Sequence, residues 1–184
     1  MSSVEARPLI LVSPFIASLL SLLLLALCTP WFNIWENAFS DLGRIEKGLT
    51  AVVFNGLVST TGAILLVYAT SVARPLAAPY RALLVLGGYS LTMIGVYPED
   101  YGRLHFYVSL AFFLASIAYM VVHAMETSVE GAVIAALGLV NLGVWTAHFT
   151  FNFPPGAAVP ELVSLVSMLA TLARDLGKTD SGQS

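Results

Sequence analysis

Six long runs of apolar residues occupy most of this 184-residue chain, and the polar residues lie mainly in the gaps between them. Hydrophobic residues make up 58% of the sequence and charged residues only 10%, whereas about a quarter of a soluble domain is charged. A soluble fold of this length needs a charged shell that the chain cannot supply. We therefore expect lipid to be the solvent for most of its surface, and an all-α fold built as an integral membrane bundle of six transmembrane helices.

The lengths of the runs agree with this interpretation, because a helix needs ~20 mostly apolar residues to cross a bilayer. The first run is longer than the apolar core of an ordinary signal peptide, so we expect it to remain as the first helix. We expect a single transmembrane domain over residues 1–174 and a polar C-terminal tail over 175–184 that frays. The expected spans are 9–27, 49–72, 82–96, 104–122, 132–149 and 157–173.

Composition excludes several classes of protein. No basic run suits nucleic acid, and no paired-cysteine or histidine-rich metal motif occurs. Cys28 is the only cysteine, so the chain cannot form an internal disulfide. Gln183 is the only glutamine, and scarcity of Gln and Cys is typical of a thermophile. Membrane lipid is the expected partner, and assembly into a homo-oligomer is left open.

The distribution of Lys and Arg predicts the orientation in the membrane. With six spans, both termini lie on the same side as the second and fourth connections, and that side holds five of the eight basic residues. Because basic residues favour the cytoplasm, we expect a multi-pass plasma-membrane protein with both termini cytoplasmic. The five are Arg7, Arg74, Arg81, Arg174 and Lys178, and the other three are Arg44, Lys47 and Arg103.

The first outward connection, residues 31–48, carries an amphipathic pattern. Three apolar residues recur at i, i+4 and i+7, and three polar residues lie on a different face. This pattern predicts a short helix lying in the membrane interface. The polar face is either a solvated surface or a functional one. The apolar residues are Trp35, Phe39 and Leu42, and the polar residues are Asn37, Ser40 and Asp41.

The second outward connection places Glu99 and Asp100 directly after a proline. Acidic residues at the start of a helix complement its dipole, so capping alone explains them, and a role in ligand binding is the alternative. The following span carries polar and aromatic residues along one face. They are His105, Ser109, Phe112, Ser116, Tyr119 and His123. His105 and His123 are ~27 Å apart along such a helix, so they cannot share a ligand, and His123 is expected at the cytoplasmic interface.

The fifth span repeats this pattern with Asn141, His148 and Asn152. Asn141 falls near the middle of the membrane and needs a hydrogen-bond partner, for which we expect Asn55 of the second span. His148 falls at the same depth as His105, so the two rings can meet. Candidate site residues therefore gather at the outward side. They are Asn37, Ser40, Asp41, Glu99, Asp100, His105, His148 and Asn152.

An ordered series of short motifs resembles the bacterial and archaeal membrane family called domain of unknown function 998. The series comprises Asn37-Ala38-Phe39-Ser40-Asp41-Leu42-Gly43, then Val53-Phe54-Asn55-Gly56, and then Gly95-Val96-Tyr97-Pro98-Glu99-Asp100 followed by His105. Tyr97 stands where the family usually has Phe. The resemblance covers nearly the whole chain and implies the same topology. It draws attention to Asn37, Ser40, Asp41, Asn55 and His105, and it implies no reaction.

Three functions are compatible with these residues. The first is an outward-facing polar site that binds a lipid, small amphiphile or ion, using Asn37, Ser40, Asn55, Glu99, Asp100, Asn141 and Asn152. The second is a metal-dependent membrane-embedded hydrolase of a lipid ester or amide, in which Asp41, His105 and His148 hold zinc and are catalytic. The third is a b-type haem protein with His105 and His148 as axial ligands. Whether the protein is an enzyme stays open at this point.

Overall fold

The computed structural model of the chain describes residues 3–73, 76–126 and 128–180, and within these ranges it describes the side chains of residues 11–177. Arg74 lies outside the described residues, and so do the side chains of Arg7 and Lys178. The fold is all-α, as predicted, with six long helices and no strand in the ranges just given. The helices are α1 (Ser3–Leu27), α2 (Leu49–Val67), α3 (Ala78–Val96), α4 (Arg103–Val121), α5 (Val129–Phe151) and α6 (Ala158–Asp180).

Among the described residues, three helical stretches are long and apolar enough to cross a membrane, namely Leu49–Val72, Arg103–Met125 and Val129–Phe151. The first stretch continues α2 through a π-helical turn, η3 (Tyr68–Val72), and the second continues α4 through a 3₁₀ turn, η5 (Val122–Met125). A helix satisfies all its own backbone hydrogen bonds, which is what a segment in hydrocarbon requires. These stretches support the expectation of a membrane protein.

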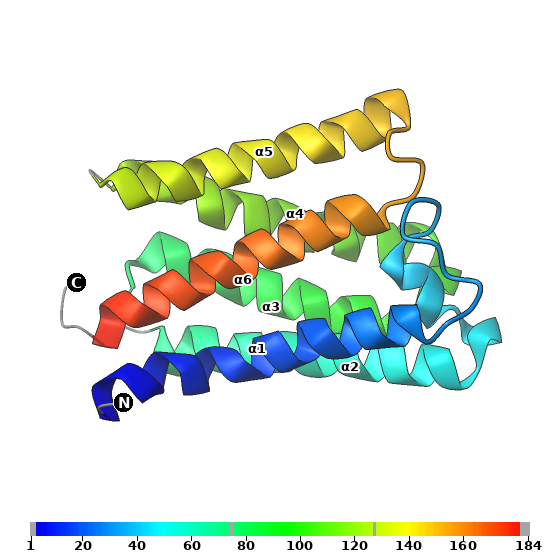
Figure 1. Cartoon of the computed structure of the whole chain (residues 1–184), viewed down its shortest axis with the longest axis horizontal. Coiled ribbons are helices and arrows are strands. Elements are labelled where there is room, and N and C mark those ends of the chain that lie inside the picture. The colour runs from blue at the N-terminus through cyan, green and yellow to red at the C-terminus, as the bar shows by residue number, and fades with distance from the viewer. Residues whose placement is uncertain (1–2, 74–75, 127, 181–184) are drawn as a thin grey trace.

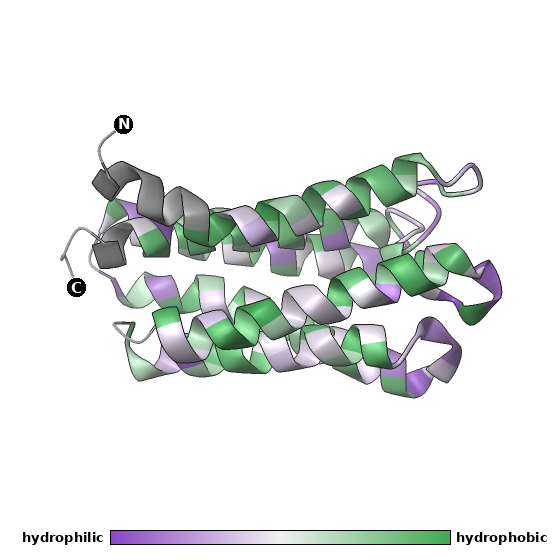
Figure 2. Cartoon of the chain, turned by 90° about the horizontal axis from the view of Figure 1, so that it is seen from below, coloured by the Kyte–Doolittle hydropathy of each residue, from purple (hydrophilic) through white to green (hydrophobic). Residues whose placement is uncertain are grey.

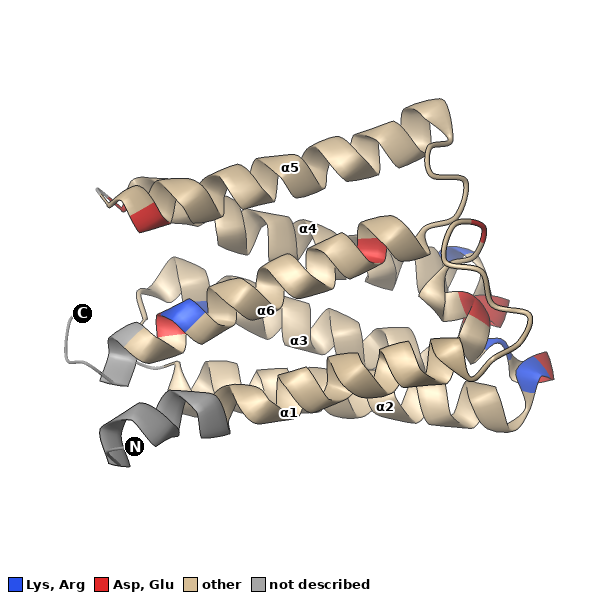
Figure 3. Ribbon diagram, in the orientation of Figure 1, with Lys and Arg blue, Asp and Glu red and all other residues tan. Residues whose placement is uncertain are grey.

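The helices run back and forth along one axis, so the start of α1 and the end of α6 lie at the same end of the bundle (Figure 1). Each helix packs against its neighbours in sequence, and α6 also packs against α1 and α4. We call the end formed by residues 28–48, 97–102 and 152–157 the loop end, and the opposite end the termini end. Figure 2 shows hydrophilic residues concentrated in the loop-end connections, and Figure 3 shows the charged residues near the two ends.

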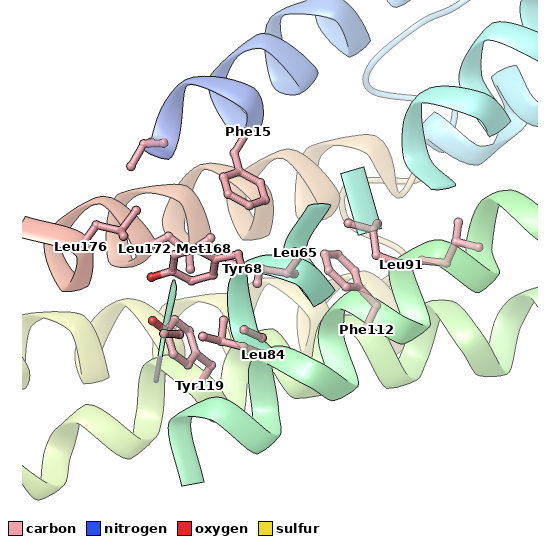
Figure 4. Packing of buried hydrophobic residues seen from close by; sticks show 14 residues of the cluster. Phe15, Leu65, Tyr68, Leu84, Leu91, Phe112, Tyr119, Met168, Leu172 and Leu176 are labelled. Atoms are coloured by element: carbon pink, nitrogen blue, oxygen red, sulfur yellow. The ribbon is translucent and has the colours of Figure 1, made fainter. Parts of the chain in front are cut away.

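The largest core cluster joins α1, α2, α3, α4 and α6 in the termini half and middle of the bundle (Figure 4). It includes Phe15 of α1, Leu65 of α2, Leu84 of α3, Phe112 of α4 and Leu172 of α6. A second cluster lies nearer the loop end and contains residues of α1, α2, α6 and the first connection. The first connection is therefore part of the packed structure and helps to shape the loop end.

Helices α2 and α3 pack most extensively, and glycines make their close approach possible. A Cβ on Gly62 would come within 2.3 Å of the Thr92 backbone nitrogen, and a Cβ on Gly95 within 2.3 Å of the Asn55 carbonyl oxygen. Both distances are far shorter than a van der Waals contact. Small residues allow helix backbones to approach in membranes, so this seam is fixed by glycines at the points where the two backbones touch.

The short helix expected in the first connection is present as 3₁₀ helix. The segment forms two 3₁₀ turns, η1 (Phe39–Gly43) and η2 (Ile45–Lys47), after an irregular stretch. Phe39 and Leu42 are buried in the second core cluster, while Trp35 is 55% exposed. The apolar spacing therefore reflects packing against α1 and α2, and it does not create one continuous apolar face for lipid.

Helix α6 continues into the stretch where the polar C-terminal tail is expected, and it ends at Asp180. Asp175 and Leu176 are only 3% and 1% exposed, so the chain is packed at the point where fraying was expected. The carboxylate of Asp175 indicates a polar, solvated segment when the sequence is taken alone. In the structure this carboxylate has buried partners, Tyr119 of α4 and His123 of η5, and the helix extends further.

Candidate functional site

Asp41 organises the first connection. It accepts hydrogen bonds from the Ala38 backbone at 2.9 Å, the Asn37 carboxamide at 3.2 Å and Arg44 Nε at 3.1 Å. Arg44 Nη2 in turn lies 2.6 Å from Glu99 Oε1. Burial and the neighbouring Asp41 carboxylate raise the pKa of Glu99 above its ordinary value, although Arg44 opposes the shift. Asn37 and Asp41 thus stabilise the loop by local bonds.

The three loop-end connections are joined to one another. The backbone nitrogen of Ile45 donates to Asp100 Oδ2 at 2.9 Å, so Asp100 links the first connection to the second. The Gly156 nitrogen donates to the Trp35 carbonyl at 2.8 Å, which links the first to the third. A Cβ on Gly156 would clash with the backbone of the first connection, so the two segments touch there directly.

His105 and His148 are each oriented by a backbone carbonyl. His105 Nδ1 lies 2.7 Å from the Tyr97 oxygen, and His148 Nδ1 lies 2.8 Å from the Pro154 oxygen. A carbonyl oxygen only accepts, so Nδ1 carries the hydrogen and the neutral ring presents a lone pair at Nε2. Ser109 Oγ lies 3.3 Å from His105 Nε2 and can donate to it.

A cavity of about 560 Å³ lies between α4, α5, the start of α6 and the loop-end connections, and we call it the loop-end cavity. Four of the predicted site residues line it, namely Ser40, Glu99, His105 and His148. They come from the first connection, from η4 (Glu99–Tyr101), from the first turn of α4 and from the last turns of α5. Segments far apart in the sequence therefore bring these four residues to one cavity.

The lining of the loop-end cavity changes along its length. Near the loop end it contains the carboxylates and imidazoles, together with Gly102 and Ala157. Further along α4 and α5 it is apolar, and it reaches Ile117, which lies ~18 Å along the helix from His105. The apolar lining consists of Phe106, Leu110, Phe113, Leu114, Ile117, Leu142, Trp145 and Phe149.

Glu161, in the first turn of α6, is a cavity residue that the sequence did not indicate as a site residue. Its Oε2 accepts the backbone N–H of Phe39 at 2.7 Å, and it lines the loop-end cavity. It also lines a second, smaller cavity of about 120 Å³ between α1, α2, α4 and α6. Its position at the start of the sixth span could have indicated a place in the cavity, because that span begins at the loop end.

The remaining predicted site residues do not line the loop-end cavity. Asn55 Nδ2 donates to the Gly43 carbonyl at 2.9 Å, and Asn141 Nδ2 donates to the Leu137 carbonyl at 2.9 Å. The expected hydrogen bond between the two asparagines is therefore absent from these described side chains. Asn152 ends α5 in the left-handed conformation, with a φ of 52°, which is a C-capping role.

The proposed zinc ligands do not form a ligand group. No set of three or more His, Cys, Asp and Glu side chains in the described part of the chain is placed to hold a metal ion. Asp41 is bonded to Asn37 and Arg44, whereas His105 and His148 line the cavity. The hydrolase hypothesis thus lacks the three-ligand arrangement on which it was based, and the haem hypothesis stays a prediction.

A second group of buried polar residues lies at the termini end. His123 is fully buried, and its Nε2 lies 3.2 Å from both oxygens of Asp175. Asp175 also accepts a short hydrogen bond from the Tyr119 hydroxyl, and Arg174 pairs with both Asp175 and Glu126. His123 is therefore a buried residue of the bundle, and these contacts bind α4 and η5 to α6.

A family model described as "Protein of unknown function (DUF998)" matches residues 11–173, which include parts of all six helices and every residue that lines the loop-end cavity. No curated protein and no solved structure matches the chain. The match covers most of the chain, as the resemblance of its motifs implied, and the protein belongs to the DUF998 family.

Proposed function

We propose that the loop-end cavity binds a membrane amphiphile, with its polar head among the loop-end residues and its chain along α4 and α5. In this proposal all six helices cross the plasma membrane and both termini are cytoplasmic, as the Lys and Arg distribution favours. The cavity then opens near the outer surface of the bilayer.

The change in lining along the cavity is the observation that supports this proposal most directly. Glu99, His105 and His148 lie at one end, and Leu114 and Ile117 lie at the other. A ligand that fills such a site must itself be polar at one end and apolar at the other. The volume of about 560 Å³ also falls in the range of roughly 300–1,000 Å³ that is usual for small-molecule sites.

The exposure of the lining residues supports entry from the lipid. Four of the cavity residues are also exposed at the surface of α4 and α5, namely Phe106 at 46%, Leu114 at 50%, Leu142 at 45% and Phe149 at 61%. An apolar opening between two spans faces acyl chains when the bundle sits in a bilayer. An amphiphile can therefore reach the cavity without leaving the membrane.

A pair of substitutions on α5 tests the proposal. Leu142 lines the cavity, whereas Leu139 is 60% exposed on the same helix and does not line it. We expect Leu142→Trp to fill the apolar end and lower the occupancy of bound amphiphile about tenfold, which corresponds to ~1.4 kcal/mol. We expect Leu139→Trp to leave the occupancy unchanged. Native mass spectrometry of protein released from nanodiscs measures the bound amphiphile directly.

Two results would overturn the proposal. One is the absence of any amphiphile on the starting protein after release from nanodiscs of native lipid. The other is an equal loss of ligand in the Leu142→Trp and Leu139→Trp variants, because that would place binding on the outer surface of α5. The haem hypothesis is tested on the same preparation, since a bound haem produces a Soret band.

A further inference from the structure

We infer that the head group held in the loop-end cavity is a primary ammonium, so that the ligand is an amine-bearing amphiphile. This inference rests on the proposed function, because it assigns the chemistry of the same site. It comes from the carboxyl and imidazole groups that line the cavity, which are Glu99, Glu161, His105 and His148.

Glu161 supplies a carboxyl group that pairs with no cation among the described side chains. It accepts a hydrogen bond from the Phe39 backbone, and the charged groups that act on it are Asp41 and Glu99, which are both acids. Glu99 adds a second acceptor, because Arg44 occupies its Oε1 while its Oε2 is buried without a hydrogen-bond partner. A buried acceptor without a donor is costly, and a cationic head group would satisfy both carboxylates.

The hydrogen bonds of His105 and His148 leave each ring with an acceptor at Nε2. Each ring donates from Nδ1 to a backbone carbonyl, Tyr97 for His105 and Pro154 for His148. The neutral ring then offers only a lone pair at Nε2. Ser109 can satisfy the lone pair of His105 at 3.3 Å, which leaves His148 as the imidazole that can accept from a ligand.

Aromatic rings complete the wall beside these acceptors. Trp145 lines the cavity between Phe113 and Phe149, with ring centroids 4.7 Å and 5.6 Å away. Its indole N–H donates to Ser164 Oγ at 3.0 Å, so that donor is already used and the ring presents only its face or edge. Aromatic faces attract cations, and they do not favour an anion.

The acceptors also distinguish between kinds of ammonium. A primary ammonium carries three N–H donors, whereas a quaternary ammonium carries none. Glu161, Glu99 Oε2 and His148 Nε2 can each accept one hydrogen bond from such a group. A carboxylate or phosphate head would instead meet acceptors and negative charge, which is unfavourable in a poorly solvated site.

Four probes with the same twelve-carbon chain test this inference: dodecylammonium, dodecyltrimethylammonium, dodecanol and dodecanoate. The measurement is fluorescence of Trp145 in a Trp31→Phe/Trp35→Phe background, in nanodiscs of zwitterionic lipid. We expect dodecylammonium to bind about tenfold more tightly than dodecanol, in line with a charge-assisted hydrogen bond, with the trimethyl probe weaker than dodecylammonium and dodecanoate weakest of all.

Glu161→Gln tests the role of the carboxylate, because the carboxamide oxygen can still accept the Phe39 N–H. We expect this variant to lose the roughly tenfold preference for dodecylammonium over dodecanol while its affinity for dodecanol stays unchanged. Glu46→Gln is the matched control, since Glu46 is 67% exposed in its pair with Lys47 at the same end and does not line the cavity. It should keep the full preference.

The possible outcomes separate this inference from the proposed function. If all four probes bind equally, or if dodecanol, dodecanoate or the trimethyl probe matches dodecylammonium, the cavity binds amphiphiles and the ammonium assignment is wrong. The assignment is also wrong if Glu161→Gln keeps the preference while remaining folded by thermal unfolding. If no probe changes the Trp145 signal or competes with bound lipid, the proposed function itself fails.

Discussion

The partner of the second ring nitrogen, Nε2, distinguishes the roles of the three histidines. All three place Nδ1 against a backbone carbonyl, which fixes the hydrogen there. At His105 the Nε2 atom faces the Ser109 hydroxyl, and His148 lines the cavity, so the neutral ring suffices at both. At His123 the Nε2 atom faces the Asp175 carboxylate, so both ring nitrogens lie against acceptors. The same residue type thus forms a buried hydrogen-bonded pair at one end and a cavity wall at the other.

The first prediction concerns this buried pair. Replacing Asp175 with Ala would leave the His123 ring and the Tyr119 hydroxyl without their acceptor in a region where both are fully buried. We expect Asp175→Ala to lower the free energy of unfolding by about 3 kcal/mol or more, because breaking a buried pair strands a charge. Unfolding by denaturing detergent in mixed micelles measures the change.

Glu46→Ala provides the comparison for Asp175→Ala. Glu46 pairs with Lys47 on the surface, and a surface pair contributes roughly 0–1 kcal/mol. Asp175→Asn should fall between the two variants, since its carboxamide oxygen still accepts one hydrogen bond. An Asp175→Ala protein as stable as Glu46→Ala would show that the contacts of Asp175 do not stabilise the bundle.

The second prediction concerns Arg44 and pH. Arg44 is the cation paired with both Asp41 and Glu99, and burial raises the pKa of Glu99 despite that pairing. A carboxyl group whose pKa is raised by folding contributes stability while it is protonated, and this contribution is lost as the pH rises through the folded-state pKa. Arg44→Ala should raise the pKa of Glu99 further, so its destabilising effect should grow with pH.

Unfolding measured at about pH 5 and about pH 8 tests this dependence. Lys47→Ala is the control, because Lys47 pairs with Glu46 and not with Glu99. We expect the stability loss of Arg44→Ala to be larger at the higher pH, and that of Lys47→Ala to be similar at both. A larger loss for Arg44→Ala at the lower pH would contradict the assignment of Glu99.

At the scale of elements, the positions of the helices follow from the sequence and the shapes of the connections do not. The second span was predicted over 49–72 and is helical from Leu49 to Val72, because ~20 apolar residues in lipid must form a helix. In the first connection, the spacing of Phe39 and Leu42 predicts a short helix that lies in the membrane interface. Tertiary packing against α1 and α2 decided its shape instead, and local periodicity carries no information about that packing.

The third prediction concerns the seam between α2 and α3. A Cβ on Gly62 would meet the backbone nitrogen and the hydroxyl of Thr92 at 2.3 and 2.6 Å, so the two helices would have to separate. A Cβ on Gly56, which precedes Gly62 on α2, would meet nothing within 4 Å. We expect Gly62→Ala to lower the free energy of unfolding by about 1–3 kcal/mol.

Gly56→Ala is the matched control on the same helix. Alanine favours a helix over glycine by up to ~1 kcal/mol, so this variant should be as stable as the original protein or slightly more stable. Unfolding in mixed micelles compares the two variants directly. Equal effects of Gly62→Ala and Gly56→Ala would mean that the helices are not in contact at Gly62.

For the whole molecule, the sequence indicated which end carries the polar residues but not which of them share a cavity. Ser40, Glu99, His105 and His148 line the loop-end cavity, whereas Asp41 is used in bonds within the first connection and Asp100 in a bond between the first and second connections. The difference depends on side-chain direction after the six helices have packed, and one sequence does not encode that direction in any local pattern. The sequence did not indicate Glu161 as a cavity residue for the same reason, since the helix dipole alone explains an acidic residue in the first turn of a helix.

The last prediction concerns orientation, which decides from which side of the membrane the cavity is reached. Cys28 is the only cysteine, it is exposed, and it directly follows α1 at the loop end. If the termini are cytoplasmic, a membrane-impermeant maleimide should label Cys28 on intact cells. Met125 is 76% exposed at the termini end, so Met125→Cys in a Cys28→Ser background should be labelled only after the cells are permeabilised.

Labelling of the denatured protein shows that each thiol is reactive, so an unlabelled thiol in intact cells reports protection by the membrane. The reverse pattern would place the loop end in the cytoplasm, because the two thiols lie at opposite ends of the bundle. Labelling of both thiols on intact cells would mean that the membrane does not separate those ends, which contradicts a bundle of six spans. This test of the orientation therefore uses two accessible positions. It does not depend on the basic residues Arg7, Arg74 and Lys178, whose side chains lie outside the described structure.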